Sequence, residues 1–143
     1  MPETRPPASK NLVTTDWLAA RLGEPEISIV DGSFYLPALK RNAKEEYLAG
    51  HIPGAVSAPW IENLDSDARF KPKAELRKHY EKLGVDPDQV AVVYCGSGVN
   101  SCHDLLALEL AGFENVKLYA GSWSDWASRD APVATGSEPG GKA

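Results

Sequence analysis

Short segments of β-branched and apolar residues alternate along this chain with segments whose apolar residues recur at helical spacing. Residues 27–31, 90–95 and 116–119 are rich in Val, Ile, Leu and Tyr, which predicts strands, and residues 55–58 predict a weaker strand. The segment 90–95, Val-Ala-Val-Val-Tyr-Cys, is apolar at nearly every position. A run of this kind is typical of a central strand that is covered on both faces of a sheet.

Helix signals lie between these strands. Thr15 is placed to cap one helix, which runs through Leu22, and Pro72 suits the first turn of a second helix. Ser101 and Asp104 form a capping-box-like start for a third helix. The alternation of strands and helices predicts an α/β domain with a mostly parallel sheet.

The two ends of the chain lack such patterns. Residues 1–10 are rich in proline and polar residues, and residues 137–143 hold no large apolar side chain. Segments of this composition cannot bury enough apolar surface to fold, so we expect both to be flexible. Residues 11–136 are then expected to form one domain, which suits a chain of 143 residues.

Composition and charge narrow the classes of function. The apolar fraction of 43% and the charged fraction of 24% are those of an ordinary soluble protein. A net charge of -5 argues against a nucleic-acid partner and against binding to an anionic membrane surface. No apolar run approaches the roughly 18 residues that cross a bilayer. The N-terminus lacks the apolar segment of a signal peptide, so the expected location is cytoplasmic.

The chain has two cysteines, Cys95 and Cys102, which are too few for a disulfide scaffold in a domain of this size. Six residues separate them, which does not fit a redox motif of the C-x-x-C type. A zinc site would have to use both thiols and His103, with no second ligand pair, so we expect no metal and no cofactor. The favoured interpretation is one reactive thiol and one buried thiol.

Cys95 is the candidate for the reactive thiol, because it ends the expected central strand, where parallel sheets place their sites. The next helix is reached through a loop made of Gly96, Ser97, Gly98, Val99 and Asn100. Glycines let successive N–H groups point at one centre, and the helix N-terminus adds positive potential there. Such a loop stabilises a thiolate and makes it nucleophilic at neutral pH. The alternative, a cysteine that only fills the core, is disfavoured by the Gly-Ser-Gly sequence.

Cys102 and His103 receive other interpretations. Cys102 falls on the helix face that carries Leu105, Leu106 and Leu110, so we expect it in the core. His103 lies next to the loop but off that face, so we expect a solvated side chain.

At this loop the sequence resembles a known family. Cys-Gly-Ser-Gly-Val with a following Cys-His resembles the active-site loop of the mercaptopyruvate sulfurtransferases, a branch of the rhodanese family. The resemblance extends over about residues 11–136. Further matching segments are Asp31 at a strand end, Gly-His-Ile-Pro-Gly-Ala at 50–55, Gly-Ser-Trp-Ser-Asp-Trp at 121–126 and Pro-Val-Ala-Thr-Gly at 132–136.

Taken alone, these further segments have plain structural interpretations. His51 stands before a Pro-Gly turn that leads into a strand, which indicates a structural role. Asp31 is expected to bond local backbone. Trp123 and Trp126 are three residues apart, which predicts a short helix that packs its aromatic face on the sheet.

The resemblance implies a single rhodanese-like domain with a mostly parallel, five-stranded sheet flanked by helices on both faces. It also implies a sulfurtransferase in which a Cys95 persulfide carries sulfane sulfur from 3-mercaptopyruvate or thiosulfate to a thiophilic acceptor, either cyanide or a thiol. A protein of a sulfur relay is a further expected partner. A persulfide carrier without turnover, or an interaction module of the same fold, stays open as the alternative.

Two features depart from the usual catalytic domain of this family. Residues 12–56 resemble the inactive first domain of two-domain members, whereas the rest of the chain resembles the catalytic second domain. An arginine usually stands two residues after the strand aspartate, and here that residue is Ser33. The nearest cations for a donor carboxylate are Lys40, Arg41 and Lys44, which otherwise form an ordinary solvated helix start.

Cysteine-dependent phosphatases and arsenate reductases have a similar fold and supply a competing function. Their Cys-x5-Arg loop needs an arginine that clamps the oxygens of the substrate bidentately. Counting from Cys95, that position is Ser101. The sequence therefore disfavours phosphoryl transfer.

Overall fold

The computed structural model describes residues 11–35, 41–96 and 100–139. Within them one sheet of five strands has the order β1-β5-β4-β2-β3, and every neighbouring pair is parallel. The expected α/β fold with a five-stranded parallel sheet is confirmed. The strands are β1 (Leu12–Val13), β2 (Ile27–Asp31), β3 (Ala55–Ser57), β4 (Val90–Tyr94) and β5 (Val116–Tyr119).

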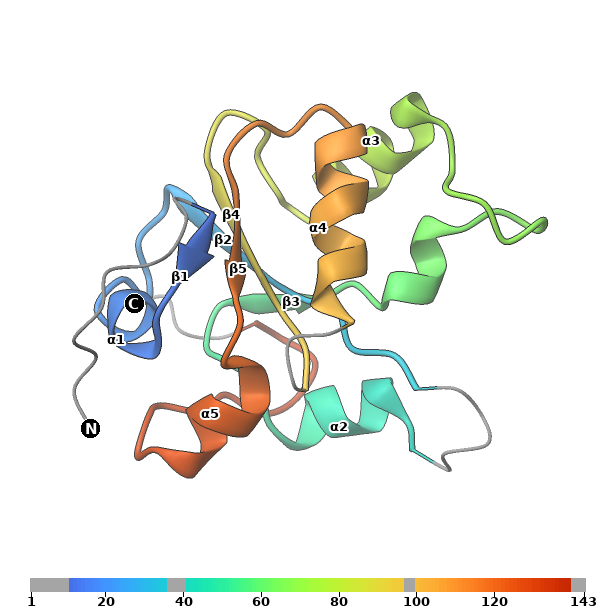
Figure 1. The fold of residues 1–143 in the computed structure, drawn as a ribbon. Coiled ribbons are helices and arrows are strands. Elements are labelled where there is room, and N and C mark those ends of the chain that lie inside the picture. Colours follow the sequence, from blue (N-terminus) through green and yellow to red (C-terminus); the bar gives the residue numbers. More distant parts are fainter. Residues whose placement is uncertain (1–10, 36–40, 97–99, 140–143) are drawn as a thin grey trace.

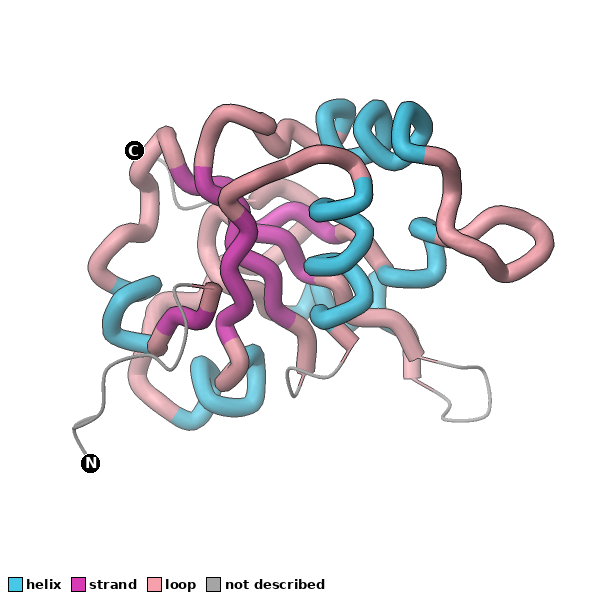
Figure 2. The backbone as a smooth tube through the Cα atoms, turned by 45° about the horizontal axis from the view of Figure 1, so that its top comes forward, coloured by secondary structure: helices cyan, strands magenta, loops and turns pink. Residues whose placement is uncertain are grey.

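Helices cover both faces of this sheet (Figures 1 and 2). Helices α3 and α4 pack on one face, and α1 and α5 pack on the other. Helix α2 lies, with α5, near the C-terminal ends of the central strands. The helices are α1 (Thr15–Ala19), α2 (Ala43–Ala49), the 3₁₀ helix η2 (Trp60–Asn63), α3 (Lys73–Lys82), α4 (Ser101–Leu110) and α5 (Ser122–Ser128).

Strand β4 carries the core because its side chains alternate between the two faces of the sheet. Val93 joins Tyr80 of α3 and Leu108 of α4 in one cluster. Val92 joins Trp126 of α5 in the other cluster. Each of these side chains is fully buried, and burying an apolar side chain of this size contributes about 1.5–3 kcal/mol. The apolar run 90–95 is therefore the central strand, as expected from the sequence.

The starts of two helices differ from the expectation. Thr14, not Thr15, caps α1, since its hydroxyl accepts a hydrogen bond from the N–H of Trp17 at 3.1 Å. Thr15 points inward instead, where its hydroxyl lies 2.6 Å from that of Tyr119. The predicted capping box of α4 is also wrong. The carboxyl of Asp104 is buried inside the protein, and the N-cap residue, Asn100, makes no side-chain capping bond.

The two segments expected to be flexible lie outside the described residues, wholly for residues 1–10 and partly for 137–143. In the described part of the chain, no helix is both long enough and apolar enough to cross a membrane.

Candidate active site

Cys95 is the first residue after β4, at the C-terminal edge of the sheet. It is 1% exposed. Its N–H donates to the Ser122 hydroxyl at 3.1 Å, and its carbonyl accepts from the N–H of Trp123 at 2.8 Å. The start of α5 therefore fixes the backbone of the candidate nucleophile on both sides of its Cα atom.

Gly96 is held in the same way. Its carbonyl accepts from the N–H of Ser124 at 2.9 Å and from the hydroxyl of Ser124 at 2.8 Å. A Cβ atom on Gly96 would lie 3.2 Å from the hydroxyl oxygen of Tyr35, which is tighter than ordinary van der Waals contact. A larger residue here would push the Tyr35 side chain away by a few tenths of an ångström, so glycine lets Tyr35 lie close to the loop.

The middle of the loop, Ser97, Gly98 and Val99, lies outside the described residues. At the far end, the side-chain amide of Asn100 donates to the Phe34 carbonyl at 3.3 Å. Helix α4 begins at the next residue. Both ends of the loop are thus anchored, and the expected cradle of N–H groups between them stays a prediction.

A cavity of about 190 Å³ adjoins this loop. Four separate stretches of chain build its wall: the end of β2 with the segment that follows it, α2 with its flanking residues, the two ends of the loop, and the start of α5. Ser33 lines the cavity, at the position where the family usually has an arginine. Its wall is formed by Asp31, Ser33, Tyr35, Arg41, Ala43, Glu46, Tyr47, Gly50, Gly96, Asn100, Trp123 and Ser124.

The three candidate cations have different positions. Lys40 lies outside the described residues, and Lys44 is exposed on α2 and does not line the cavity. Arg41 does line it. Its guanidinium binds the carboxylate of Glu46 through two bonds, of 2.6 Å and 3.0 Å, and stacks over the Tyr35 ring at 3.9 Å from the centroid. Arg41 is therefore the candidate for binding an anionic substrate.

The expected core position of Cys102 is wrong. Cys102 is exposed, as are Leu106 and Leu110, each 45% exposed. The buried residues of α4 are instead Ser101, Asp104, Ala107 and Leu108, so the buried face is displaced from the one that the leucines predict. The sequence pattern is misleading here because two polar residues, Ser101 and Asp104, lie on the buried face.

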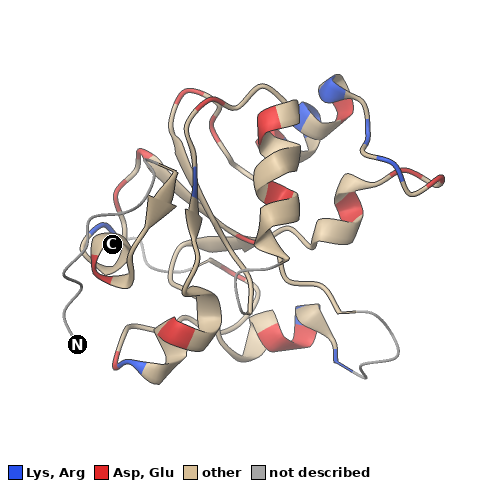
Figure 3. Ribbon diagram, viewed as in Figure 1, with Lys and Arg blue, Asp and Glu red and all other residues tan. Residues whose placement is uncertain are grey.

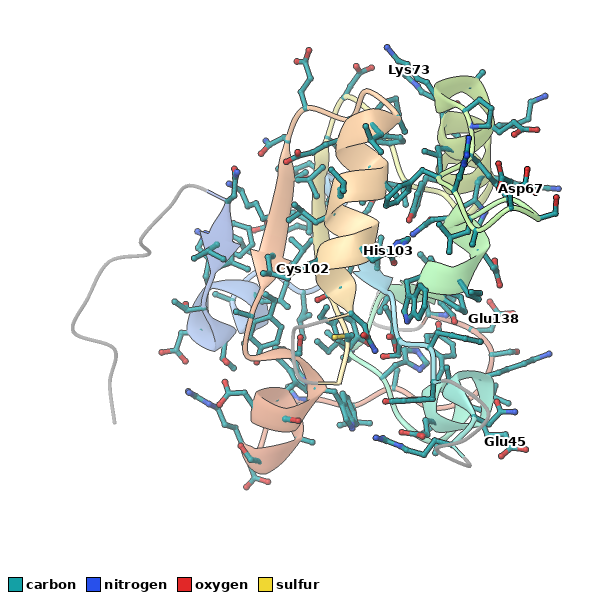
Figure 4. All side chains as sticks on the ribbon, turned by 45° about the vertical axis from the view of Figure 1, so that its right-hand side comes forward. Glu45, Asp67, Lys73, Cys102, His103 and Glu138 are labelled. Atoms are coloured by element: carbon teal, nitrogen blue, oxygen red, sulfur yellow. The ribbon has the colours of Figure 1, made fainter. Side chains whose placement is uncertain are left out.

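The expected solvated position of His103 is also wrong. Its ring packs against Trp60 at 5.0 Å and Phe70 at 4.6 Å between centroids. Partial burial lowers the pKa of His103. Cys102 and His103, labelled in Figure 4, are neighbours in the first turn of α4, and their side chains point in different directions.

A buried polar cluster that the sequence did not suggest lies behind the loop. The side-chain amide of Asn63 donates to Oδ1 of Asp104 at 2.6 Å, and the Tyr80 hydroxyl donates to the Asn63 carbonyl oxygen at 2.6 Å. Oδ2 of Asp104 has no hydrogen-bond partner among the described residues. Burial raises the pKa of Asp104 to about 8, so its carboxyl is mostly protonated at neutral pH.

Asp31 and His51 have the structural roles expected from the sequence. Oδ1 of Asp31 accepts a hydrogen bond from the N–H of Ser33 at 2.9 Å, and burial raises the pKa of Asp31. The His51 ring is fully buried and stacks on Tyr47 at 3.8 Å. Its ring nitrogens lie 2.9 Å and 3.0 Å from the carbonyl oxygens of Tyr47 and Pro139. Both residues hold backbone around the cavity.

Ser122 is a further residue of this region that sequence analysis did not single out. It is fully buried and has a positive φ of 55°, a conformation that costs a non-glycine residue free energy. Its hydroxyl accepts from Cys95 and donates to the Tyr119 carbonyl at 3.0 Å. These two hydrogen bonds connect α5 to the ends of β4 and β5.

Replacing Ser122 with alanine should lower the free energy of unfolding by about 1–3 kcal/mol, because the buried N–H of Cys95 loses its partner. Chemical denaturation measures this change. Ser128→Ala, at an exposed position of the same helix, is the matched control and should have a much smaller effect. Equal losses in the two variants would show that the Ser122 hydroxyl does not support the loop.

No group of three or more His, Cys, Asp or Glu side chains is arranged to hold a metal ion in the ranges that the structure describes. Cys95 is buried directly before Gly96, which lines the cavity together with Arg41.

Comparisons with known proteins agree with this geometry. The model of the rhodanese-like domain family matches residues 14–129. The chain is 42% identical over 134 residues to a probable 3-mercaptopyruvate sulfurtransferase of Pseudomonas aeruginosa, an alignment that covers 91% of this chain and 46% of that protein. It is 44% identical over 92 residues to the sulfur carrier protein TtuD of Thermus thermophilus, which covers 63% of this chain and 32% of that protein.

Among solved structures, SseA from Escherichia coli is described as having the rhodanese fold of 3-mercaptopyruvate sulfotransferases. It matches with a TM-score of 0.84 and 28% identity, over 92% of this chain and 52% of that chain. The chain thus spans about a third to about a half of the length of these relatives.

Proposed function

The chain belongs to the rhodanese family, and on this premise we propose that it is a sulfurtransferase whose Cys95 carries sulfane sulfur as a persulfide. The observation that carries the proposal is the position of Cys95, whose backbone is fixed by α5 and whose neighbour Gly96 lines the cavity together with Arg41. A thiol held in this way can attack a small donor bound in the cavity, with little freedom lost on binding.

The proposed reaction has two steps. The Cys95 thiolate attacks the sulfur of 3-mercaptopyruvate, the carbon–sulfur bond breaks, and the carbon fragment takes a proton and leaves as pyruvate. With thiosulfate the sulfur–sulfur bond breaks and sulfite leaves. In the second step cyanide or a thiol attacks the outer sulfur of the persulfide, which restores the thiolate.

The preferred donor follows from the charges near the loop. Gly96, Ser97, Gly98 and Val99 bring no cationic side chain to the transferred sulfur. Thiosulfate carries two negative charges at that end, whereas the charge of mercaptopyruvate sits on a carboxylate that Arg41 can hold from across the cavity. We therefore propose that mercaptopyruvate is the better donor.

Steady-state assays with each donor and cyanide as acceptor test this proposal. We expect a higher kcat/KM for mercaptopyruvate, and Arg41→Ala should raise its KM roughly tenfold, as expected for a lost charged hydrogen bond. Lys44→Ala is the control, because Lys44 is exposed and does not line the cavity. A clear preference for thiosulfate that Arg41→Ala leaves unchanged would contradict the donor assignment.

A second candidate function is a persulfide carrier that receives sulfur from a protein partner in a relay. It is favoured by the similarity to a relative named a sulfur carrier. A carrier would accept sulfur from a desulfurase in a single turnover but show no turnover with small donors. An enzyme would turn over both donors with cyanide.

A further inference from the structure

The charges around the cavity are nearly balanced, and one ion pair sets that balance. Arg41 is the only cationic side chain among the described residues that line the cavity. Two carboxyl groups line it as well, those of Asp31 and Glu46. Asp31 is buried and its pKa is raised, whereas Glu46 is half-exposed and bound to Arg41. In the ribbon of Figure 3 the acidic positions of α2 are red and lie below the C-terminal ends of the central strands.

We propose that Glu46 is a specificity-determining residue of this site. Its carboxylate occupies the two N–H groups of the Arg41 guanidinium to which the carboxylate of an anionic donor would bind. The two bonds from Arg41 to Glu46 use Nε and Nη2, the fork with which a guanidinium binds a carboxylate bidentately. A donor carboxylate that binds Arg41 through this same fork must displace Glu46 from it. The inference rests on the proposed sulfurtransferase function and adds the residue that selects among its donors.

The ion pair is weak enough to open. The side chains of Arg41 and Glu46 are 53% and 42% exposed, and exposed ion pairs are weak because water and salt screen them. The Tyr35 ring, on which the guanidinium stacks at 3.9 Å from the centroid, remains a contact of Arg41 when Glu46 moves away. The Tyr35 hydroxyl lies close to Gly96, so the ring that carries Arg41 reaches the loop. A donor carboxylate can therefore replace Glu46 while Arg41 keeps its contact with Tyr35.

The displaced Glu46 carboxylate stays on α2 beside the cavity and repels a bound anion. The repulsion of a dianion is twice that of a monoanion at the same distance. Glu46 therefore selects for donors with one negative charge and against thiosulfate. The donor class that fits is a small monoanionic carboxylate with a transferable sulfur.

Glu46→Gln tests this inference, since it removes the charge and keeps the size of the side chain. We expect kcat/KM to rise about threefold for mercaptopyruvate and, because the charge is doubled, about tenfold for thiosulfate. The gain should appear in KM, leave kcat unchanged and shrink at high salt. Glu45→Gln is the matched control, because it removes the same charge from the exposed, neighbouring position of α2, which does not line the cavity (Figure 4).

A second readout does not depend on sulfur transfer. Cys95 is alkylated with anionic iodoacetate and with neutral iodoacetamide in a Cys102→Ser background, and the ratio of the two rates reports the charge at the thiol. Glu46→Gln should raise this ratio about threefold and Glu45→Gln should leave it unchanged. If the ratio rises while no donor turns over, the proposed function fails and the charge effect of Glu46 stands. If neither the ratio nor the donor preference changes, the inference is wrong.

Discussion

Replacing Cys95 with serine should abolish sulfur transfer from either donor, by at least about a thousandfold in kcat, because a hydroxyl cannot form a persulfide. The fold should stay intact, since serine has almost the same shape and the backbone bonds to Ser122 and Trp123 do not use the side chain. The cyanide assay measures the activity, and thermal unfolding by circular dichroism measures the stability.

Cys102→Ser is the control for this experiment. Because Cys102 is exposed, the substitution should retain most of the activity and change the free energy of unfolding by less than about 0.5 kcal/mol. An equal loss of activity in the two well-folded variants would mean that both thiols take part in the transfer, and Cys95 alone would not be the nucleophile.

Replacing Asp104 with asparagine should stabilise the protein increasingly as the pH rises. Burial raises the pKa of Asp104 from 3.8 to about 8 in the folded state. Between these two pH values the folded protein keeps a proton that the unfolded chain has released. The free energy of unfolding therefore falls as the pH rises through this window, with a slope of up to about 1.4 kcal/mol per pH unit.

Asparagine stays neutral in both states, so the variant lacks this pH-dependent loss. The free energy of unfolding of the variant relative to that of the unchanged protein should increase from pH 4 to pH 8, by several kcal/mol in total, and level off above that range. Urea denaturation at a series of pH values measures it. Glu109→Gln removes a carboxyl from the exposed side of α4 and controls for the change in net charge. Parallel pH profiles for Asp104→Asn and the unchanged protein would show that Asp104 is ionised in the native state.

The strands that hold the core could be predicted from the sequence, because each is a short apolar run that only a covered strand accommodates. The segments 27–31, 90–95 and 116–119 correspond to β2, β4 and β5 to within one residue. Strand β1 could not be predicted, because its two residues carry no periodic signal. It exists through its pairing with β5, a contact between segments far apart in the sequence.

The position of Cys95 could also be predicted, because a strand end followed by glycine and a helix is a local pattern. The residues that surround this site could not be predicted, because they come from distant parts of the chain. Ser122 lies 27 residues further along the chain, and Arg41 lines the cavity from the segment just before α2. The local sequence predicts a helix cap at Asp104 because a carboxylate suits that role, and only the fold shows Asn63 beside it. The buried face of α4 also differs from the predicted one, because it includes the polar residues Ser101 and Asp104.

The central claim is that Cys95 receives sulfur from a small donor. Mass spectrometry of the protein after exposure to 3-mercaptopyruvate, without an acceptor, tests it directly. The account predicts a mass increase of about 32 Da, localised to Cys95 by fragmentation and removed by cyanide. An increase localised to Cys102, or an unchanged mass at Cys95 in protein that is folded and reduced, would contradict it.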